Sequence, residues 1–251
     1  IVLVPATIQA IMDQPQWQHH LSSLRSITTG SSVVPDALLE PFRALRLPVQ
    51  QVYGLTETAP IAVYQSAAQA LEKESSTGLA ALHCDMQLVD KHGLSVAQGE
   101  IGQIRIKGPN VMFEYWGNPQ ATAQALHNGW FDTGDLGYLD TDGHLVVTDR
   151  AKDMIISGGE NVYPAELEKL LYTIPGVRDA AVVGRHHDKW GETPVAIVVK
   201  HSDSDLAAED ILTYFHGRLA RFKHPQEVIF VDDLPRNVMG KVQKFLLRAM
   251  L

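Results

Sequence analysis

Cysteine, long apolar runs and positive charge are all scarce in this sequence of 251 residues. Cys84 is the sole cysteine, so no disulfide can form within the chain, and a reducing compartment such as the cytoplasm is the expected location. No apolar run approaches the roughly 20 residues of a membrane-spanning helix, so we expect no transmembrane segment. Lys and Arg number 21 against 29 Asp and Glu, a formal net charge of −8. This balance argues against nucleic acid or an anionic membrane surface as the main partner.

The rest of the composition is that of a globular protein. Hydrophobic residues make up 45% and charged residues 20% of the chain, and 251 residues can form one large domain or two smaller ones. The first five residues, IVLVP, carry no initiator Met and no basic region, so they do not form a signal peptide. They read as a strand cut in the middle, and we expect the chain to be part of a longer protein.

Helices and strands alternate over residues 1–76. Helical patterns at Thr7–Met12 and Pro35–Leu45 are interleaved with short strands at Ser26–Thr29 and Val49–Val52. This alternation predicts an α/β part-domain whose functional loops follow the carboxyl ends of the strands.

Residues 77–151 have a different character. Short strands are expected at Met86–Val89, Gly102–Lys107 and His144–Val147, separated by glycines and by the hairpin signal Asp142-Gly143. We therefore expect a small β-barrel-like subdomain that completes a first domain of residues 1–151.

The remaining residues, 152–251, predict a compact α+β C-terminal domain of ordinary size. The expected elements are helices at Ala165–Tyr172, at Ala208–Leu219 and from Val242, and strands at Ala180–Val183, Val195–Val199 and Glu227–Val231.

Four motifs follow one another along the chain: VYGLTETAP at Val52–Pro60, GWFDTGDLGYLDTDGHL at Gly129–Leu145, DRAKDMIISGGENVYPAELE at Asp149–Glu168, and LPRNVMGKVQK at Leu234–Lys244. In this order and spacing they resemble the adenylate-forming (AMP-binding) enzymes, and within them the acyl-CoA synthetases. The resemblance covers the whole chain. The phosphate loop of that family, rich in glycine and serine, is absent here and lies upstream in relatives. The resemblance therefore implies the carboxyl-terminal half of a synthetase.

A two-step reaction is what this resemblance implies. A small-molecule carboxylic acid attacks the α-phosphate of ATP, with Mg²⁺ present, to give an acyl-adenylate and pyrophosphate. The thiol of CoA then attacks the acyl carbonyl and expels AMP. Catalysis of such a reaction depends more on positioning the reactants and neutralising their charge than on covalent catalysis by the protein. Val33, Val52 and Ile61 favour an apolar acid.

The turn Gly30-Ser31-Ser32 is the first segment that the resemblance places at the nucleotide. It follows a strand and precedes a helix, and small residues there would let the adenine ring approach the backbone. An ordinary strand–helix turn explains the same three residues. The second and third positions depart from the family pattern, because both are serine.

Two further segments of the first domain match the nucleotide site of the family. In the turn of residues 53–57, Tyr53 would stack on adenine beside Gly54, Thr56 would bond the α-phosphate, and Glu57 would supply an oxygen ligand to Mg²⁺. Asp135 would accept bonds from both ribose hydroxyls. The neighbouring residues Asp132, Asp140 and Asp142 do not match the motif and are expected to be turn residues.

The charged stretch after the barrel-like subdomain is predicted to be a hinge. The resemblance has Arg150 reach the ribose or phosphate and Lys152 act as the pivot of the C-terminal domain, and solvated charge lets such a linker move without burying an unpaired ion. Gly158 and Gly159 would line the CoA tunnel, where glycine removes side-chain obstruction. A static linker is the simpler alternative.

Lys241 matches the catalytic lysine of the family, which bridges the substrate carboxylate and the α-phosphate during adenylation. A lysine near a chain end is usually a solvated surface residue, and only the flanking motif changes that interpretation. The histidines, 11 in number, include the adjacent pairs His19-His20 and His186-His187. Adjacent histidines lack the i, i+4 spacing of a helical zinc site, so no metal ligation by histidine is expected.

Two other functions stay open from the sequence. A peptide-synthetase adenylation domain would run the same first step and pass the acyl group to a carrier protein. A chain without the phosphate loop could also be a non-catalytic fragment or binding module. The sequence indicates neither the identity of the acid nor an oligomeric state.

Overall fold

The structure is a computed structural model that describes residues 1–30, 34, 36–73, 76–237 and 240–251. The chain divides into two compact parts, unit 1 (Ile1–Val147) and unit 2 (Thr148–Leu251), each of which is described here by itself. Mixed α/β structure with an antiparallel curled sheet, followed by an α+β unit, confirms the predicted fold class. The division falls shortly before the predicted boundary, and the assignment of the pivot to Lys152 stays a prediction.

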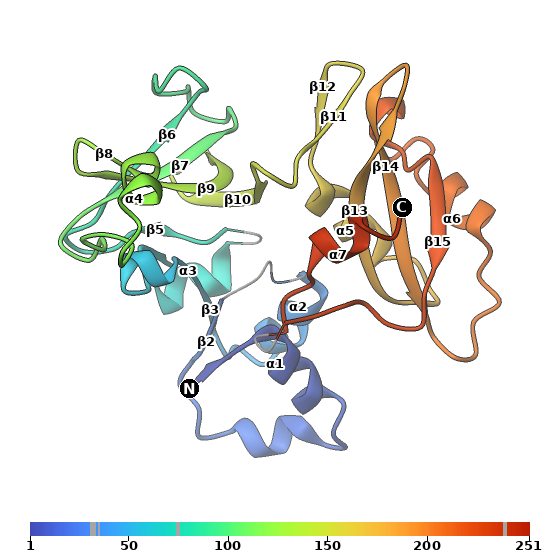
Figure 1. The fold of residues 1–251 in the computed structure, drawn as a ribbon. Helices are drawn as coiled ribbons and strands as arrows, with labels where there is room; N and C mark the ends of the chain where they lie inside the picture. The colour runs from blue at the N-terminus through green and yellow to red at the C-terminus, as the bar shows by residue number, and fades with distance from the viewer. Residues whose placement is uncertain (31–33, 35, 74–75, 238–239) are drawn as a thin grey trace. The chain divides into compact units, whose positions relative to one another are not determined.

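Unit 1 begins with a sheet of five strands in the order β1-β2-β3-β4-β5 (Figure 1). The first three strands are parallel, as expected for an α/β part-domain, and the last two are antiparallel. The strands are β1 (Val2–Leu3), β2 (Ile27–Thr29), β3 (Val49–Tyr53), β4 (Val63–Tyr64) and β5 (Leu79–Ala80). The helices are α1 (Pro5–Met12), α2 (Asp36–Ala44) and α3 (Ala67–Glu72), with short 3₁₀ turns η1 (Trp17–Leu21) and η2 (Thr56–Thr58).

Helices α1 and α2 pack against the parallel strands through one apolar core. The buried members include Ile8, Ile27, Leu38, Phe42 and Val49. The alternating strands and helices predicted for residues 1–76 therefore form because each helix has an apolar face that the sheet covers.

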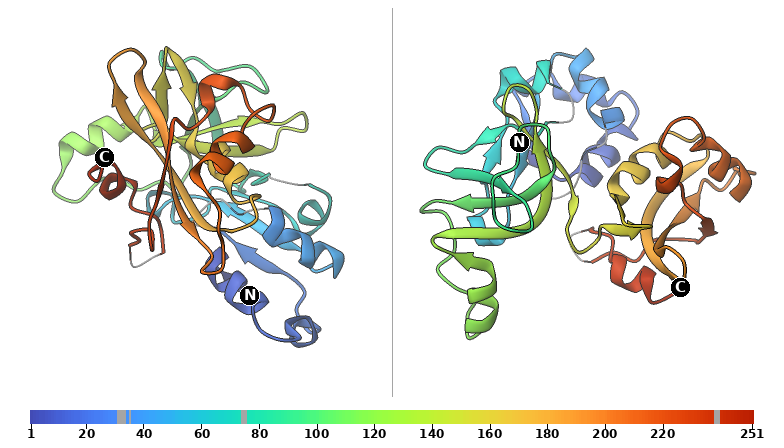
Figure 2. Two further views of the ribbon diagram at one scale, coloured as in Figure 1. Left: turned by 90° about the vertical axis from the view of Figure 1, so that its right-hand side faces the viewer. Right: turned by 90° about the horizontal axis from the view of Figure 1, so that it is seen from above.

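A second, antiparallel sheet has the order β10-β9-β7-β6, with β8 paired to β9. It belongs to unit 1 except for the end of β10, residues 148–150, which is counted with unit 2. Its strands curl as the barrel-like prediction requires (Figure 2, right). The elements are β6 (Asp85–Val89), β7 (Gly102–Lys107), α4 (Pro119–Ala125), β8 (Leu126–His127), β9 (Trp130–Leu139) and β10 (Leu145–Arg150). Cys84 lies in the core of this sheet, where burial raises the pKa of its thiol.

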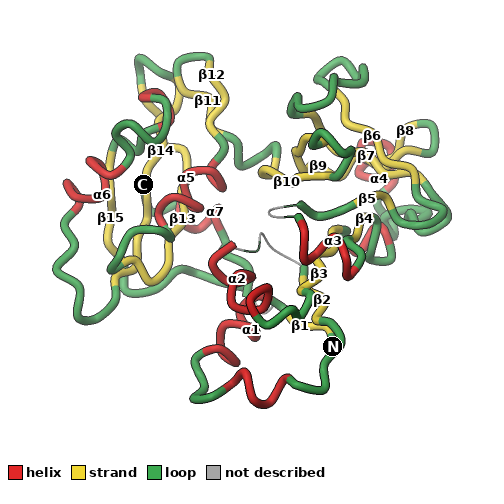
Figure 3. Tube along the Cα trace, turned by 180° about the vertical axis from the view of Figure 1, so that it is seen from behind, coloured by secondary structure: helices red, strands yellow, loops and turns green. Residues whose placement is uncertain are grey.

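Unit 2 contains a sheet in the order β12-β11-β14-β13, and β15 runs parallel to β14 (Figures 1 and 3). The strands are β11 (Ile155–Ser157), β12 (Glu160–Val162), β13 (Val177–His187), β14 (Gly191–Lys200) and β15 (Glu227–Phe230). The helices are α5 (Pro164–Leu171), α6 (Ala208–Tyr214) and α7 (Lys244–Arg248), with the 3₁₀ turn η3 (Arg221–Lys223).

Both faces of the β13–β14 pair are covered, because successive side chains of a strand point to opposite sides. One face packs against α5 and α6, and its buried residues include Val182, Val198, Leu171 and Phe215. The opposite face packs against α7, and its buried residues include Val183, Val195, Ile197 and Leu247. Helix α7 is short, so its attachment to the unit depends on this packing rather than on helix propensity.

The structure differs from the sequence-based expectation in several elements. Helices α3 and α4 and strands β4, β5, β8 and β12 were not predicted. The ten-residue strand β9 was not predicted, α6 ends at Tyr214 rather than Leu219, and α7 begins at Lys244 rather than Val242. Shortly after α6, Gly217 has a φ of 75°, a conformation that does not continue a helix. In the described part of the chain, no helix is long and apolar enough to cross a membrane.

Candidate functional site

A half-buried tyrosine bonded to a buried aspartate joins the two sheets of unit 1. Tyr53 is the last residue of β3, and its hydroxyl donates a hydrogen bond of 2.8 Å to Oδ2 of Asp135 in β9. Asp135 is only 6% exposed. Its amide donates to the hydroxyl of Thr133 (3.1 Å), which in turn donates to the carbonyl of Ile104 in β7 (2.8 Å). The carboxylate is thus held in one place by a chain of hydrogen bonds across the curled sheet.

The turn after Tyr53 can be built only with glycine. A Cβ atom at Gly54 would lie 1.6 Å from the carbonyl oxygen of Pro60, far inside contact distance. The chain folds back this tightly because the amide of Ala62 donates to the carbonyl of Tyr53 (2.9 Å). The hydroxyl of Thr58 accepts the amide of Leu55 (2.9 Å) and so fixes the 3₁₀ turn η2. This turn presents Thr56 at the surface.

Glu57, on the same turn, is held by a residue that the sequence did not single out. Its Oε1 accepts a hydrogen bond of 2.9 Å from the hydroxyl of Tyr115, and its carbonyl accepts the amide of Met112 (2.7 Å). Burial and the bond to Glu57 raise the pKa of Tyr115. Phe113, Tyr115 and Trp116 place three aromatic rings in four residues of a chain with 7% aromatics. This concentration of aromatic residues is the feature of the sequence that could have indicated a functional loop here.

The carboxylate on this turn fits a magnesium ion that is bound together with a triphosphate. Mg²⁺ in such sites is held by one or two carboxylates plus phosphate oxygens and water, rather than by a cage of protein ligands. Glu57 supplies one hard carboxylate, and its bond to Tyr115 does not exhaust the lone pairs of that group. Among the described residues, no group of three or more His, Cys, Asp or Glu side chains could hold a metal ion.

The predicted Gly30 turn is described only in part. A Cβ at Gly30 would lie 2.7 Å from the carbonyl oxygen of Val52, so close packing of β2 against β3 is enough to require glycine there. Ser31, Ser32 and Val33 lie outside the described residues. The contact of this turn with adenine stays a prediction.

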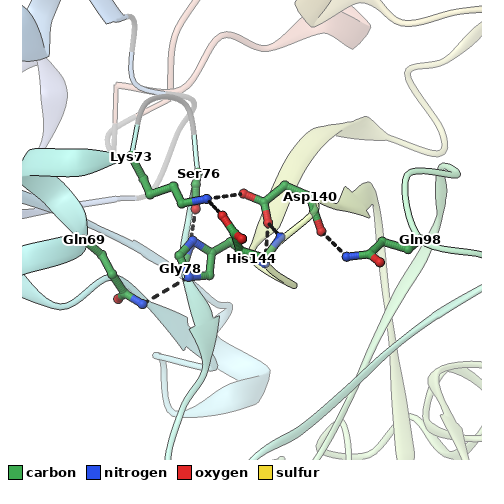
Figure 4. A network of polar contacts seen from close by, with 8 residues as sticks. Gln69, Lys73, Ser76, Gly78, Gln98, Asp140 and His144 are labelled. Atoms are coloured by element: carbon green, nitrogen blue, oxygen red, sulfur yellow. Dashed lines mark hydrogen bonds and ion pairs between the residues drawn. The ribbon is translucent and has the colours of Figure 1, made fainter.

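A polar network next to the site fastens α3 to the turn between β9 and β10 (Figure 4). Oδ1 of Asp140 accepts the amides of Asp142 (2.9 Å) and His144 (2.8 Å), and Lys73 forms ion pairs with both carboxylates. Gln69 of α3 lies 3.1 Å from Nε2 of His144. Asp140 and Asp142 are turn residues as predicted, and their network anchors the end of the strand that carries Asp135.

Asp132 was predicted to be a turn residue, and this was wrong. It lies within β9, where Nε of Arg105 on the adjacent strand β7 donates to its Oδ1 (2.5 Å). A cross-strand ion pair on a sheet explains this acidic residue without any turn.

In unit 2, the predicted hinge stretch lies at the end of β10 and in the turn after it. Arg150 and Lys152 are exposed, whereas Asp149 accepts the amide of Ala165 in the first turn of α5 (2.8 Å). Burial raises the pKa of the Asp149 carboxyl. Asp153 is bonded to Arg248 of α7 (2.8 Å). The exposed charges of the stretch thus alternate with carboxylates that are anchored in the unit.

Gly158 and Gly159 form the two-residue turn of the β11–β12 hairpin. Their φ values are 63° and 88°, and a turn of this kind needs positive φ at both positions, which glycine adopts freely. The amide of Gly158 donates to the carbonyl of Trp190 (2.8 Å). A Cβ at Gly159 would meet no atom within 4 Å, so glycine there is required by the backbone and not by space.

Lys241 stands on an exposed loop that is closed by bonds between its own residues and is tied to β13 by the ion pair of Arg236 with Asp179 (2.5 Å). The amide of Asn237 donates to the carbonyl of Lys241 (2.9 Å), and the side chain of Asn237 accepts the amide of Lys241 (3.0 Å). Arg236 closes the loop by donating to the carbonyl of Gly240 (2.6 Å). Residues 238 and 239 of this loop lie outside the described part of the chain.

The predicted residues therefore fall into two groups. Unit 1 brings together Tyr53 and Asp135 by a direct bond, and Gly54, Thr56 and Glu57 share the turn that follows Tyr53. Unit 2 carries Arg150, Lys152, Gly158, Gly159 and Lys241 on its linker and loops. The role of each residue stays a prediction.

Two family models match this chain. The model described as AMP-binding enzyme matches residues 1–116, and the model described as AMP-binding enzyme C-terminal domain matches residues 166–241. The motif at Tyr53 thus falls inside a matched segment, and Lys241 is the last residue of the other.

Individual relatives agree with these models. The chain is 49% identical over 244 residues to an indoleacetate–CoA ligase of Aromatoleum aromaticum, covering 97% of this chain and 48% of the ligase. It is 43% identical over 242 residues to a feruloyl-CoA synthase of an Amycolatopsis species, covering 96% and 49%. The structure matches o-succinylbenzoate CoA synthetase of Bacillus subtilis, solved with ATP and magnesium, at a TM-score of 0.87 and 37% identity, covering 100% and 50%. The chain spans about half the length of the curated relatives it matches.

Proposed function

This chain belongs to the AMP-binding enzymes, and from that premise we propose that it is the carboxyl-terminal part of an AMP-forming ligase that joins a carboxylic acid to CoA. The bonded pair of Tyr53 and Asp135 is the observation that carries the proposal. A nearly buried carboxylate held by a tyrosine and its own backbone is suited to receive two hydroxyl donors of a ribose. Each hydrogen bond to such a charged group contributes about 1.5–3 kcal/mol.

Around that pair, the turn of unit 1 would hold the phosphates. The exposed hydroxyl of Thr56 donates to the α-phosphate, and Glu57, oriented by Tyr115, binds the magnesium ion. When bound, magnesium supplies positive charge that offsets the charge of the triphosphate. Since Tyr115 fixes the Glu57 carboxylate before any ligand arrives, little reorganisation is needed when the nucleotide binds.

Lys241 would serve the first chemical step. A carboxylate oxygen attacks the α-phosphorus, the bond to the pyrophosphate oxygen breaks, and the products are acyl-adenylate and pyrophosphate. Both reactants carry negative charge, so a cation between the carboxylate and the α-phosphate lowers the barrier. Lys241 is exposed on a loop fixed by Asn237 and Arg236, which leaves its ammonium group accessible to a ligand.

The second step would use the β11–β12 hairpin. The CoA sulfur attacks the acyl carbonyl, the bond to the phosphate oxygen breaks, and AMP leaves. Gly158 and Gly159 offer a turn without side chains, which suits the passage of a narrow thiol arm. We assign the pivot between the two steps to Lys152, which is exposed beside an anchored Asp153.

For the acid we propose an apolar, aromatic carboxylic acid acted on in the cytoplasm. The two relatives named above are an indoleacetate ligase and a feruloyl-CoA synthase, and both names denote aromatic acids. Val52 and Ile61, next to the Tyr53 turn, are apolar.

The test uses the full-length protein with a panel of aromatic and straight-chain acids. We expect acid-dependent exchange of pyrophosphate into ATP, and acyl-CoA together with AMP when free CoA is the only thiol, with aromatic acids the best substrates. Exchange without acyl-CoA would favour a carrier protein as acceptor. No exchange with any acid would overturn the proposal. The 251-residue chain alone, which lacks the phosphate loop, should show no exchange and is the matched control.

A further inference from the structure

Helix α7 begins three residues after Lys241 and connects to the hinge stretch. Its two cationic residues, Lys244 and Arg248, are four positions apart and so lie on one face of the helix. Leu247, which is 0% exposed, packs the helix onto the face of β13 and β14. The chain after Lys241 therefore continues directly into an anchored element.

Arg248 reaches the first residue after the proposed pivot. Its Nη2 lies 2.8 Å from Oδ1 of Asp153, with 33% of the Arg248 side chain and 13% of the Asp153 side chain exposed. Asp153 in turn is tied to the linker, since its amide donates to the carbonyl of Arg150 (2.9 Å). An ion pair of this burial is held more firmly than an exposed surface pair.

Lys244 reaches a second carboxylate, on α5. Its Nζ lies 2.8 Å from Oε1 of Glu168, with 15% and 18% of the two side chains exposed. The same Oε1 accepts the amide of Val182 in β13 (2.8 Å). Lys244 also attracts the Asp149 carboxylate, which accepts the amide of Ala165. Helix α7 is thus bonded to α5 and lies close to the carboxylate that precedes Arg150.

We propose that Arg248 and Lys244 are positioning residues that fix the loop of Lys241 to the residues beside the hinge, so that a turn of the backbone at Lys152 carries Lys241 as part of one rigid body. This inference rests on the proposed function. The loop of Lys241 is also held to β13 by the ion pair of Arg236 with Asp179, but that pair does not reach the residues beside the hinge. Without Arg248 and Lys244, the loop would be connected to those residues only through β13 and the packing of a five-residue helix. Lys241 would then reach the α-phosphate less often after each swing.

The β11–β12 hairpin has contacts of its own that do not involve α7. Its Ser157 pairs with Gly191 of β14, and the amide of Gly158 donates to Trp190. Loosening α7 should therefore disturb the step that uses Lys241 and spare the step that uses the glycine turn. A loss of overall stability would lower both steps together, so the two explanations give different results.

The variant Arg248→Gln is made in the full-length protein, and the two half-reactions are measured separately. We expect pyrophosphate exchange to fall about 10- to 100-fold, because small misplacements of a catalytic group have effects of that size. Thioester formation from supplied acyl-adenylate should stay close to wild type. Arg248→Lys, which keeps the charge, should recover much of the loss. The double variant with Asp153→Asn should be no worse than Arg248→Gln alone, because both changes break one interaction.

Arg185→Gln is the matched control, because it breaks an ion pair of 2.6 Å to Glu227 elsewhere on the same unit. It should change neither half-reaction. Unchanged exchange in Arg248→Gln, or equal losses in both half-reactions, would overturn the proposal.

Hydrogen–deuterium exchange of residues 240–251 provides a readout that needs no activity. These amides should exchange faster in Arg248→Gln than in wild type and in Arg185→Gln. If the wild-type protein formed no acyl-adenylate at all, the proposed function would fail, and this measurement would still decide the coupling. Equal protection in the three proteins would show that the ion pair does not hold α7.

Discussion

In unit 1 the candidate side chains are fixed by one another across the sheets. In unit 2 they stand on a hairpin turn and a loop that are tied to the sheet by other residues, through Gly158 to Trp190 and Arg236 to Asp179. Tyr53 and Asp135 are 82 residues apart in sequence, and Glu57 and Tyr115 are 58 apart. The bond that holds Lys241 to Asn237 spans only four residues. Distant partners make a site that is ready before its ligand binds, at the cost of needing the whole unit to be folded.

Local bonding in unit 2 has the opposite consequence. The partners Trp190 and Asp179 belong to unit 2 themselves. These bonds therefore do not have to break when the unit moves, and each loop keeps its shape. The difference suggests a division of labour in which unit 1 binds the nucleotide and unit 2 delivers one loop for each chemical step.

The largest effect on catalysis should come from removing the ammonium group of Lys241. Lys241→Ala in the full-length protein should reduce the rate of adenylation about 10²- to 10³-fold, the usual loss for one preorganised electrostatic donor. Thioester formation from supplied acyl-adenylate should be largely spared. Pyrophosphate release and acyl-CoA formation, measured separately, check this. If both half-reactions fell equally, the loops of unit 2 would not serve separate steps.

Two glycine substitutions, one in each unit, test whether glycine is needed to avoid a steric clash or to allow a positive φ. Gly54→Ala in unit 1 places a Cβ 1.6 Å from Pro60, so we expect a loss of about 3 kcal/mol in the free energy of unfolding. Gly159→Ala in unit 2 meets no atom within 4 Å but keeps a positive φ, which should cost only about 1–2 kcal/mol. Urea unfolding of both variants tests the order. Equal losses of unfolding free energy in the two variants would contradict the view that Gly54 avoids a steric clash whereas Gly159 only allows a positive φ.

A change at the proposed pivot should have a moderate effect. Proline at Lys152 fixes φ near −65° and pushes Ala151 toward extended conformations, so one of two backbone states should be lost. We expect Lys152→Pro to slow the CoA step at least about tenfold more than adenylation, because ATP and Lys241 help to hold the adenylation state. The melting temperature controls for folding. Wild-type rates in both steps would place the pivot elsewhere.

The smallest effect concerns the partly buried carboxyl group of Glu168, which is paired with Lys244 of α7. Burial raises the pKa of Glu168 against the opposing charge of Lys244. A carboxyl group with a higher pKa in the folded protein contributes stability that is complete below its unfolded pKa and is lost as the pH rises through its folded pKa. Relative to Glu168→Gln, the wild type should therefore be less stable at pH 8 than at pH 5.

Asp149, whose pKa is also raised, interacts with Glu168 and with the same Lys244, so the comparison is repeated in an Asp149→Asn background. Urea unfolding at the two pH values measures the difference. A gap between wild type and variant that stays the same at both values would mean that Glu168 does not titrate differently on folding.

Strand β9 shows where prediction from sequence stops. Its residues WFDTGDLGYL contain the glycine and aspartate that usually indicate turns. The structure nevertheless buries alternate positions, among them Thr133 and Asp135. The pattern of a strand is hidden because polar residues occupy inward positions, and the hydrogen bonds of Asp135 make that burial possible.

Other features follow directly from local sequence. Most helices and strands were predicted within a few residues, because their apolar periodicity is strong. The bond between Tyr53 and Asp135 could not be predicted from local patterns, because it depends on how two sheets meet. Tyr115 was missed for the same reason.

Cys84 gives the molecule a built-in chemical reporter. It is the only thiol of the 251 residues, it is 8% exposed in the core of the curled sheet, and burial raises its pKa, so reagent has little access and thiolate is scarce. The rate at which a maleimide labels the native chain therefore measures how often that sheet opens. Unit 2 has no cysteine of its own. A buried cysteine introduced there in a Cys84→Ser background would therefore report, through its labelling rate, how often unit 2 opens.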